Sequence, residues 1–134
     1  MGKLKVMIAE DQEDLLRLLV QRLSKTYEIT AAVRDGKSLV EGAILLKSDV
    51  IVSDVSMPVA TGLQAMKELI ERECRIPFVF ITAETELVVQ GAWSVVDKAI
   101  IFVGLEAAIE SAAVGQVYVS RRARLLRGQG TPES

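Results

Sequence analysis

The chain has no histidine among its 134 residues and only one cysteine, Cys74. Without histidine there can be no Ser–His or Cys–His nucleophile pair, and the commonest transition-metal ligand is missing. A single cysteine excludes an internal disulfide and fits a reducing cytoplasm. Because Cys74 lies in a charged stretch, we interpret it as inert. Any chemistry must therefore use carboxylates, hydroxyls and lysines.

Long apolar runs and a strong charge of one sign are also lacking. The uncharged apolar runs are far shorter than the ~20 residues that span a bilayer, and the first residues lack the long apolar region of a signal peptide. The net charge of −2 gives no basic field for nucleic acid or an anionic membrane. Half of the residues are hydrophobic and a quarter are charged, which is a globular composition. We expect one cytoplasmic domain with its own core and no membrane contact.

Apolar, β-branched segments alternate along the chain with segments of helical periodicity. Strands are predicted over 5–9, 27–33, 50–54 and 78–81, and helices over 12–24, 37–47 and 63–72. This alternation predicts an α/β fold in which a parallel sheet is covered by helices on both faces. The flavodoxin-like arrangement is a doubly wound, five-stranded parallel sheet of order 2-1-3-4-5 with about five helices.

Polar residues stand where three of these strands end. The first strand is followed by Glu10 and Asp11, the third ends in Asp54, and the fourth is followed by Thr82. In parallel sheets, ligands bind at the carboxyl ends of the strands, where the strand order reverses. Pro58 biases the preceding residue away from the helical region, so the chain turns after Asp54. We expect these four side chains to lie together at one edge of the molecule.

Three neighbouring carboxylates repel one another unless a cation intervenes. Mg²⁺ suits such a group, and a carboxylate with an open face can then attack a phosphoryl group, towards which Thr82 can donate a hydrogen bond. The plainer alternative is three independent capping acids, but three such coincidences are improbable. A flavodoxin-like cofactor pocket is disfavoured because Glu13 and Asp14 would repel its phosphate.

These stretches resemble the receiver domains of bacterial two-component response regulators. The matching segments are 6–11, 54–58 with Gly62-Leu63, and 81–83. The segment 105–120 looks most like the subgroup with a helix-turn-helix output domain. The resemblance covers residues 3 to about 121 and implies the CheY-like form of the fold. It divides the chain into a receiver domain at 1–120 and, at 121–134, a basic and then Gly/Pro-containing tail or linker stub.

The resemblance assigns roles to individual residues. It implies that Asp54 accepts a phosphoryl group from a sensor histidine kinase. Glu10, Asp11 and Asp54 would bind Mg²⁺, with the backbone carbonyl of Ser56 as a further ligand. Thr82 would follow the phosphoryl group and repack as the domain switches conformation to regulate an output, such as transcription. The chain would be a phosphoacceptor with at most self-catalysed phosphorylation and dephosphorylation, not a conventional enzyme.

The resemblance also leaves room for a homodimer and for a DNA-binding output domain outside this chain. Ser56 and Glu84 stand where the family tunes its dephosphorylation rate. Trp93, with neighbouring apolar residues, is a candidate docking patch, although core packing explains it better. Thr61 replaces the acid that usually precedes Gly62.

The lysine that the family places just after strand five has two candidate registers. In the first, strand five is 94–96 and Lys98 is that lysine. In the second, 85–97 is an amphipathic helix, strand five is 99–103, and Gly104 stands in place of the lysine. The bounded β-branched run and the regular polar stripe favour the second register.

The second register motivates an alternative function. A receiver without its lysine would act as a degenerate, phosphorylation-independent protein-interaction module. The aromatic residue that usually reports phosphorylation would be Val95 in the first register or Ile101 in the second. Because neither residue is aromatic, the usual route of the signal would be altered in both.

Overall fold

The computed structural model describes residues 2–83, 94–98 and 101–118. In this part of the chain, five strands and four helices follow one another. They are β1 (Lys5–Ala9), α1 (Glu13–Leu23), β2 (Glu28–Val33), α2 (Gly36–Leu45), β3 (Val50–Asp54), α3 (Gly62–Glu71), β4 (Phe78–Thr82), β5 (Ser94–Asp97) and α4 (Ile101–Ala113).

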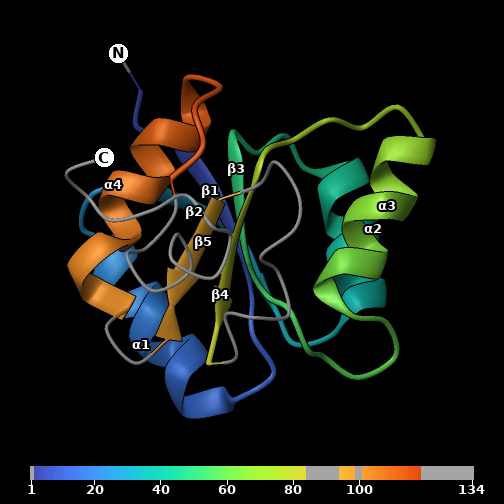
Figure 1. The fold of residues 1–134 in the computed structure, drawn as a ribbon, viewed down its shortest axis with the longest axis horizontal. Coiled ribbons are helices and arrows are strands. Elements are labelled where there is room, and N and C mark those ends of the chain that lie inside the picture. The colour runs from blue at the N-terminus through green and yellow to red at the C-terminus, as the bar shows by residue number, and fades with distance from the viewer. Residues whose placement is uncertain (1, 84–93, 99–100, 119–134) are drawn as a thin grey trace, which may run out of the picture.

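The five strands form one parallel sheet of order β2-β1-β3-β4-β5. Helices α1 and α4 cover one face of the sheet, and α2 and α3 cover the other (Figure 1). This is the doubly wound order that the sequence predicts, and β1 and β3 are neighbours at the point where the strand order reverses.

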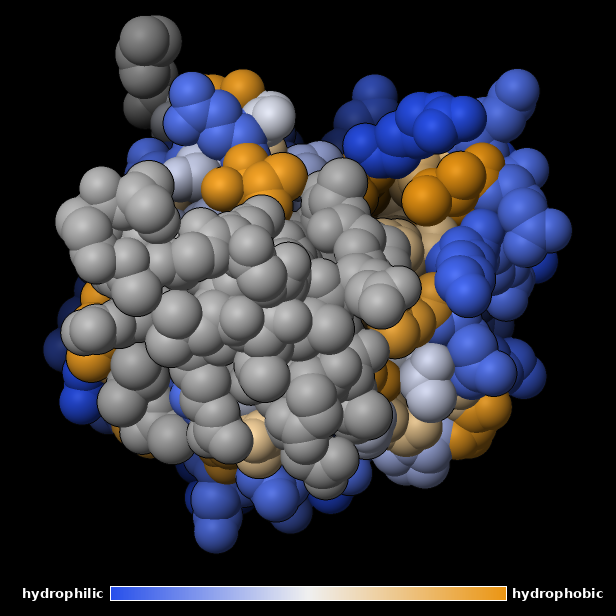
Figure 2. All heavy atoms as spheres, in the orientation of Figure 1, coloured by the Kyte–Doolittle hydropathy of each residue, from blue (hydrophilic) through white to orange (hydrophobic). Residues whose placement is uncertain are grey.

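A hydrophobic core lies on each face of the sheet. Leu19, Leu23, Leu105 and Ile109 fill the layer under α1 and α4, whereas the α2 and α3 layer is built around Leu39, Leu69 and Phe80. Strands β3 and β4 are buried along their whole length, as continuous apolar strands in covered parallel sheets are. Figure 2 shows mostly hydrophilic residues on the outer surface over α3, with smaller hydrophobic patches between them.

The last strand corrects the register that the sequence favours. Ser94–Asp97 pairs with β4 over its full length, and Ile101–Ala113 is helical. The prediction of a helix reaching Asp97 is therefore wrong, and so is the prediction of a strand at 99–103. The first register is confirmed, and Lys98 directly follows β5.

The sequence favours the wrong register because β5 is a short edge strand and α4 begins with apolar residues. The residues of α4 that face the core are Ile101, Leu105, Ala108, Ile109 and Ala112. A buried helix that begins with an apolar run cannot be told from a strand by periodicity. The apparent polar stripe is also a coincidence, because Ser94 and Asp97 are both buried within β5.

Several sequence predictions concern residues outside the described part of the chain. These are the helix expected from residue 85, the dephosphorylation position Glu84, the Trp93 patch and the tail 121–134. Val95, which stands in the first register where the family usually has an aromatic residue, is fully buried in the layer under α2 and α3. Among the described helices, none has the length and apolar character needed to cross a bilayer.

Candidate functional site

The carboxyl ends of β1 and β3 bring three carboxylates together. One carboxylate oxygen from each of Glu10, Asp11 and Asp54 lies within 4.8 Å of the others. Glu10 is fully buried, Asp54 is 6 % exposed and Asp11 is half-buried. Thr82 ends β4, is also buried, and directly follows Ile81, the residue paired with Asp54 in the sheet. The structure therefore places all four strand-end residues at the same edge of the sheet.

Backbone amides orient two of the carboxylates. The Gln12 amide donates to Glu10 Oε2 at 2.9 Å, and the Ser56 amide donates to Asp54 Oδ1 at 3.2 Å. Helix α3 begins close behind Asp54 because Gly62 has no side chain. A Cβ at Gly62 would overlap the Asp54 carbonyl oxygen. These contacts fix the direction in which the Asp54 carboxylate points.

Lys98 completes the cluster from the end of β5. Its ammonium lies 3.1 Å from Asp54 Oδ2, 3.0 Å from Glu10 Oε1 and 3.3 Å from Glu10 Oε2. The Lys98 side chain is only 15 % exposed, so water screens these contacts weakly. The register that the sequence favours has no lysine at this position, but the structure places Lys98 beside Asp54. One cation is therefore shared between two buried carboxylates.

The electrostatics of the cluster follow from burial. Burial raises the pKa of Glu10, and the nearby Asp54 charge raises it further. Burial also raises the pKa of Asp54, although Lys98 and the Ser56 amide act in the opposite direction. For Lys98, burial alone would lower the pKa, but its contacts with Glu10 and Asp54 outweigh burial and raise it. The groups of the cluster therefore hold their protons more tightly than exposed groups would. Another cation would stabilise the charged forms of the two carboxylates.

The donor set fits Mg²⁺. Hard divalent cations prefer oxygen ligands, and Mg²⁺ is commonly held by a few carboxylates together with waters. Glu10 Oε1 is buried and accepts no hydrogen bond within the usual geometry, although the Lys98 ammonium lies near it. Glu10, Asp11 and Asp54 can supply the protein ligands of such a site.

The loop after β3 turns sharply before α3 begins. Ala60 donates a backbone hydrogen bond to the Pro58 carbonyl at 2.8 Å, which closes a γ-turn around Val59. Val59 has a φ of 72°, a strained conformation for a β-branched residue. The turn packs against the start of α2, where a Cβ at Gly36 would overlap Ala60.

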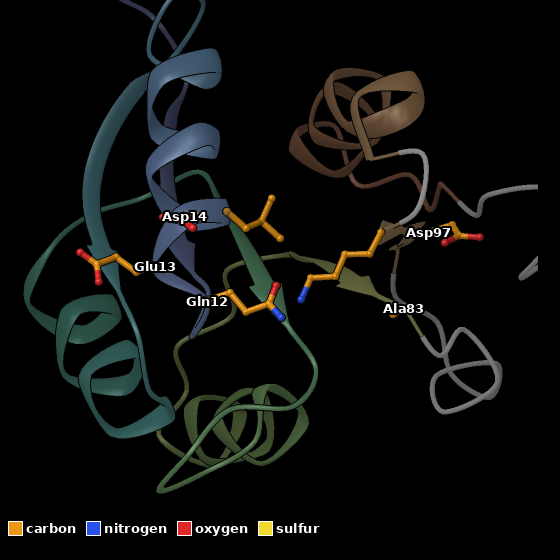
Figure 3. A pocket seen from close by; sticks show the side chains of 7 residues that line it. Gln12, Glu13, Asp14, Ala83 and Asp97 are labelled. Atoms are coloured by element: carbon orange, nitrogen blue, oxygen red, sulfur yellow. The ribbon is translucent and has the colours of Figure 1, made fainter.

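An open cavity of about 780 Å³ lies next to the cluster. Figure 3 shows Gln12 at the start of α1 on one side of it, and Ala83 and Asp97 at the ends of β4 and β5 on the other. Lys98 also lines the cavity. The cavity therefore gives access from solvent to the side of the cluster where Lys98 lies.

Sequence reasoning missed two contributors to the site. The amide of Gln12 holds Glu10, and nothing in the side chain of Gln12 signals this role. Asp97 was assigned to the polar stripe of a helix, although the structure buries it beside the cavity. The available signal was the Asp-Lys pair at 97–98 after two valines, which resembles the strand ends at 10–11 and 54.

A family profile described as "Response regulator receiver domain" matches residues 6–110. The chain belongs to this family. The match spans all five strands, the carboxylate cluster and Lys98, and it ends within α4. The receiver is therefore of the kind used in two-component systems.

Curated relatives resemble the receiver over part of their length. The alkaline phosphatase synthesis transcriptional regulatory protein PhoP of Bacillus subtilis is 30 % identical over 83 residues, which are 61 % of this chain and 34 % of PhoP. The transcriptional regulatory protein PdtaR of Mycobacterium tuberculosis is 40 % identical over 81 residues, 59 % of this chain and 38 % of PdtaR. The matches thus span little more than a third of these relatives.

Solved structures agree with the fold. The receiver domain of the putative response regulator NarL from Mycobacterium tuberculosis has a TM-score of 0.74 and 23 % identity, covering 87 % of this chain and all of that one. RcsB from Salmonella enterica serovar Typhimurium, solved bound to a promoter, has a TM-score of 0.82 and 17 % identity, covering 96 % of this chain and 68 % of that one. At these identities the likeness shows the fold alone.

Proposed function

We propose that this receiver accepts a phosphoryl group on Asp54 from the phosphohistidine of a sensor histidine kinase, in a reaction that needs Mg²⁺. The observation that carries the proposal is the arrangement around Asp54. Its carboxylate is held by the Ser56 amide and by Lys98 and belongs to a three-carboxylate cluster, and Lys98 also lines an open cavity. Such a carboxylate is oriented for nucleophilic attack, and the cavity lined by Lys98 offers a route towards it.

The transfer exchanges one bond for another. A carboxylate oxygen of Asp54 forms a bond to phosphorus, while the bond from phosphorus to the donor imidazole nitrogen breaks and its electron pair stays on that nitrogen. These 134 residues contain no histidine, so the donor histidine lies outside them. Mg²⁺ held by Glu10, Asp11 and Asp54, with the Ser56 carbonyl as a further ligand, would offset negative charge on the phosphoryl oxygens.

Lys98 and Thr82 would stabilise the product. The ammonium of Lys98 lies 3.1 Å from Asp54 Oδ2, so a phosphoryl group on Asp54 would come within its reach. Thr82 ends the strand next to β3, and its hydroxyl would donate a hydrogen bond to a phosphoryl oxygen. Thr82 would thereby couple modification of Asp54 to a change at the ends of β4 and β5.

A degenerate receiver that acts as an interaction module remains the second candidate function, but there is less reason to propose it. That alternative depended on the loss of the lysine, and Lys98 contacts both buried carboxylates. A receiver that had become an interaction module would have no need to hold one buried cation between Glu10 and Asp54, since burying charges is costly. Phosphorylation therefore accounts for the site better.

The output of the receiver is proposed from its relatives. PhoP and PdtaR are named transcriptional regulatory proteins, and the matches cover about a third of each. We infer that residues 1–120 act as the receiver unit and that 121–134 lead towards an output domain that regulates transcription. Dimer formation on phosphorylation fits the same role, as structures of RcsB dimers bound to DNA exist.

The proposal is tested by intact-protein mass spectrometry after incubation with Mg²⁺ and acetyl phosphate. We expect the wild type to gain the mass of one phosphoryl group, which peptide mapping places on Asp54. Asp54→Asn should gain none, and chelation of the metal should abolish the gain.

Asp14→Asn is the matched control, because Asp14 lines the same cavity but its side chain is fully exposed and lies outside the carboxylate cluster. It should be phosphorylated like the wild type. A wild-type protein that gains no mass from acetyl phosphate or from a phosphorylated histidine kinase would refute the proposal and favour the interaction module.

A further inference from the structure

The outer edge of β5 is met by the chain that follows α4. One edge of β5 pairs with β4, and at the other edge the Val95 amide donates to the Tyr118 carbonyl at 2.9 Å. The Tyr118 amide in turn donates to Ser94 Oγ at 2.9 Å. These two hydrogen bonds fasten Tyr118 to the first two residues of β5. We call this contact the Tyr118 latch.

The side chain of Tyr118 packs against α4. The ring lies over Gly104, where a Cβ would overlap the tyrosine hydroxyl, and it packs against the core layer under α1 and α4. Gly104 itself is buried. Glycine in the interior of a helix costs about 0.5–1 kcal/mol relative to alanine, so a close approach of this kind gives the residue a structural purpose.

The latch and the candidate phosphoacceptor share one short element. Strand β5 has four residues, and Lys98 follows directly after Asp97. Ser94 and Val95 hold Tyr118 at one end of the strand, while Lys98 contacts Asp54 and Glu10 at the other. Val95 and Val96 are buried in opposite core layers, so the strand is packed on both faces. A displacement at one end of so short a strand would therefore also displace the other end.

We propose that the Tyr118 latch positions Lys98 towards Asp54 and that, reciprocally, the state of Asp54 sets how tightly the latch is closed. Tyr118 and Ser94 are positioning residues in this scheme, since they act through β5 and do not touch Asp54. Because coupling free energies are reciprocal, the segment that continues from Tyr118 is biased by whatever binds Lys98. The part of the inference that concerns phosphorylation rests on the proposed function, whereas the coupling between Asp54 and the latch does not.

The test measures hydrogen exchange of the Val95 amide, which reports opening of the latch directly. Gly104→Ala is the main variant, because its Cβ meets the far end of a flexible side chain and alanine favours the helix. Val103→Ala is the matched control, since Val103 is the preceding residue of α4 and is 79 % exposed. We expect Gly104→Ala to speed Val95 exchange by roughly five-fold or more and Val103→Ala to leave it unchanged.

Two further measurements test the coupling. Asp54→Asn, in protein that has not been phosphorylated, should change Val95 exchange by roughly five-fold in the wild-type background and have little effect in Gly104→Ala. In the presence of Mg²⁺ and acetyl phosphate, Gly104→Ala and Tyr118→Ala should both slow the gain of mass at Asp54 by several-fold. Their double variant should be no slower than either, because both changes remove the same contact.

The outcomes separate the two proposals. If Val95 exchange speeds up in Gly104→Ala while the rate of phosphorylation and the effect of Asp54→Asn stay unchanged, the latch is only structural and the inference is overturned, but the proposed function stands. If no variant or wild-type protein is phosphorylated, the proposed function fails, and the Asp54→Asn measurement still decides whether Asp54 and the latch are coupled.

Discussion

At the residue scale, the site depends on one cation shared between buried acids. Lys98 contacts Glu10 and Asp54, whose carboxylates are held at the ends of adjacent strands. Burial works against every charge in this group, and the single ammonium does not bring the carboxylates back to their ordinary pKa values. The cluster is therefore arranged for binding further positive charge, at a cost to the stability of the metal-free fold.

The first prediction concerns the pH dependence of stability. Because the pKa values of Asp54 and Glu10 are raised in the folded state, the folded chain binds protons more tightly than the unfolded chain, and stability falls as pH rises above the ordinary range near 4. Asp54→Asn removes one of these charges. Without Mg²⁺ it should melt roughly 2–4 °C above the wild type at pH 7.

Thermal unfolding followed by circular dichroism at pH 4 and pH 7 measures this difference. The gain should be smaller at pH 4 than at pH 7, because lowering the pH protonates more of the wild-type carboxylates, and it should also shrink when Mg²⁺ stabilises the wild type. Asp14→Asn serves again as the exposed control. An Asp54→Asn protein that melts below the wild type at pH 7 would show that the ion pair with Lys98 outweighs the cost of burial.

At the element scale, the start of α3 holds the back of the site. Thr61 caps the helix by accepting from the Gln64 amide at 3.1 Å, and Gln64 Oε1 accepts from the Thr61 amide at 2.8 Å. This capping box fixes the direction of α3 where Gly62 packs behind Asp54. Thr61 differs from the acid that the family usually places there, but its hydroxyl accepts the hydrogen bond that caps α3.

The second prediction follows from this cap. Thr61→Ala should lower the free energy of unfolding by about 1 kcal/mol, because the Gln64 amide loses its acceptor. Thr61→Asp should keep the stability within a few tenths of a kcal/mol, since aspartate is an equally good N-cap residue. Urea unfolding measures both values. Equal losses in the two variants would mean that the threonine methyl, not its hydroxyl, is what matters at this position.

At the scale of the whole molecule, the two ends of the domain are tied together on one face of the sheet. The hydroxyl of Tyr27, at the end of α1 and the start of β2, donates to Glu110 Oε2 on α4 at 2.8 Å. Arg22 of α1 also lies over the ring of Phe102 at 4.5 Å. These contacts join helices that are nearly eighty residues apart in sequence, and they hold α4 in the position from which the Tyr118 latch reaches β5.

The third prediction concerns this connection at alkaline pH. Burial and the hydrogen bond to Glu110 raise the pKa of Tyr27 well above its ordinary value of 10.0. The stability of the wild type is therefore unaffected by Tyr27 below about pH 10 and falls as pH rises beyond it. Tyr27→Phe should cost about 1 kcal/mol at pH 7, because Glu110 loses its donor.

The same variant should lose less stability than the wild type between pH 9 and pH 11. Urea unfolding at the two pH values measures the change. Lys98 also loses its charge in the alkaline range, but it is present in both proteins, so the comparison isolates Tyr27. A parallel loss in both proteins would show that folding does not raise the pKa of Tyr27.

The sequence by itself determined the alternation of strands and helices, the order of the sheet and the edge at which Glu10, Asp11, Asp54 and Thr82 meet. Those features follow from hydrophobic periodicity and from the rule that parallel strands end at one edge. Only the tertiary structure decided the position of Lys98. Apart from the Asp-Lys pair at 97–98, the residues from Ser94 onwards carry little local signal that separates a short edge strand from a helix, because pairing with β4 and burial under α4 fix that choice. The latch of Tyr118 on β5 is likewise a contact between distant segments, which periodicity along the chain cannot report.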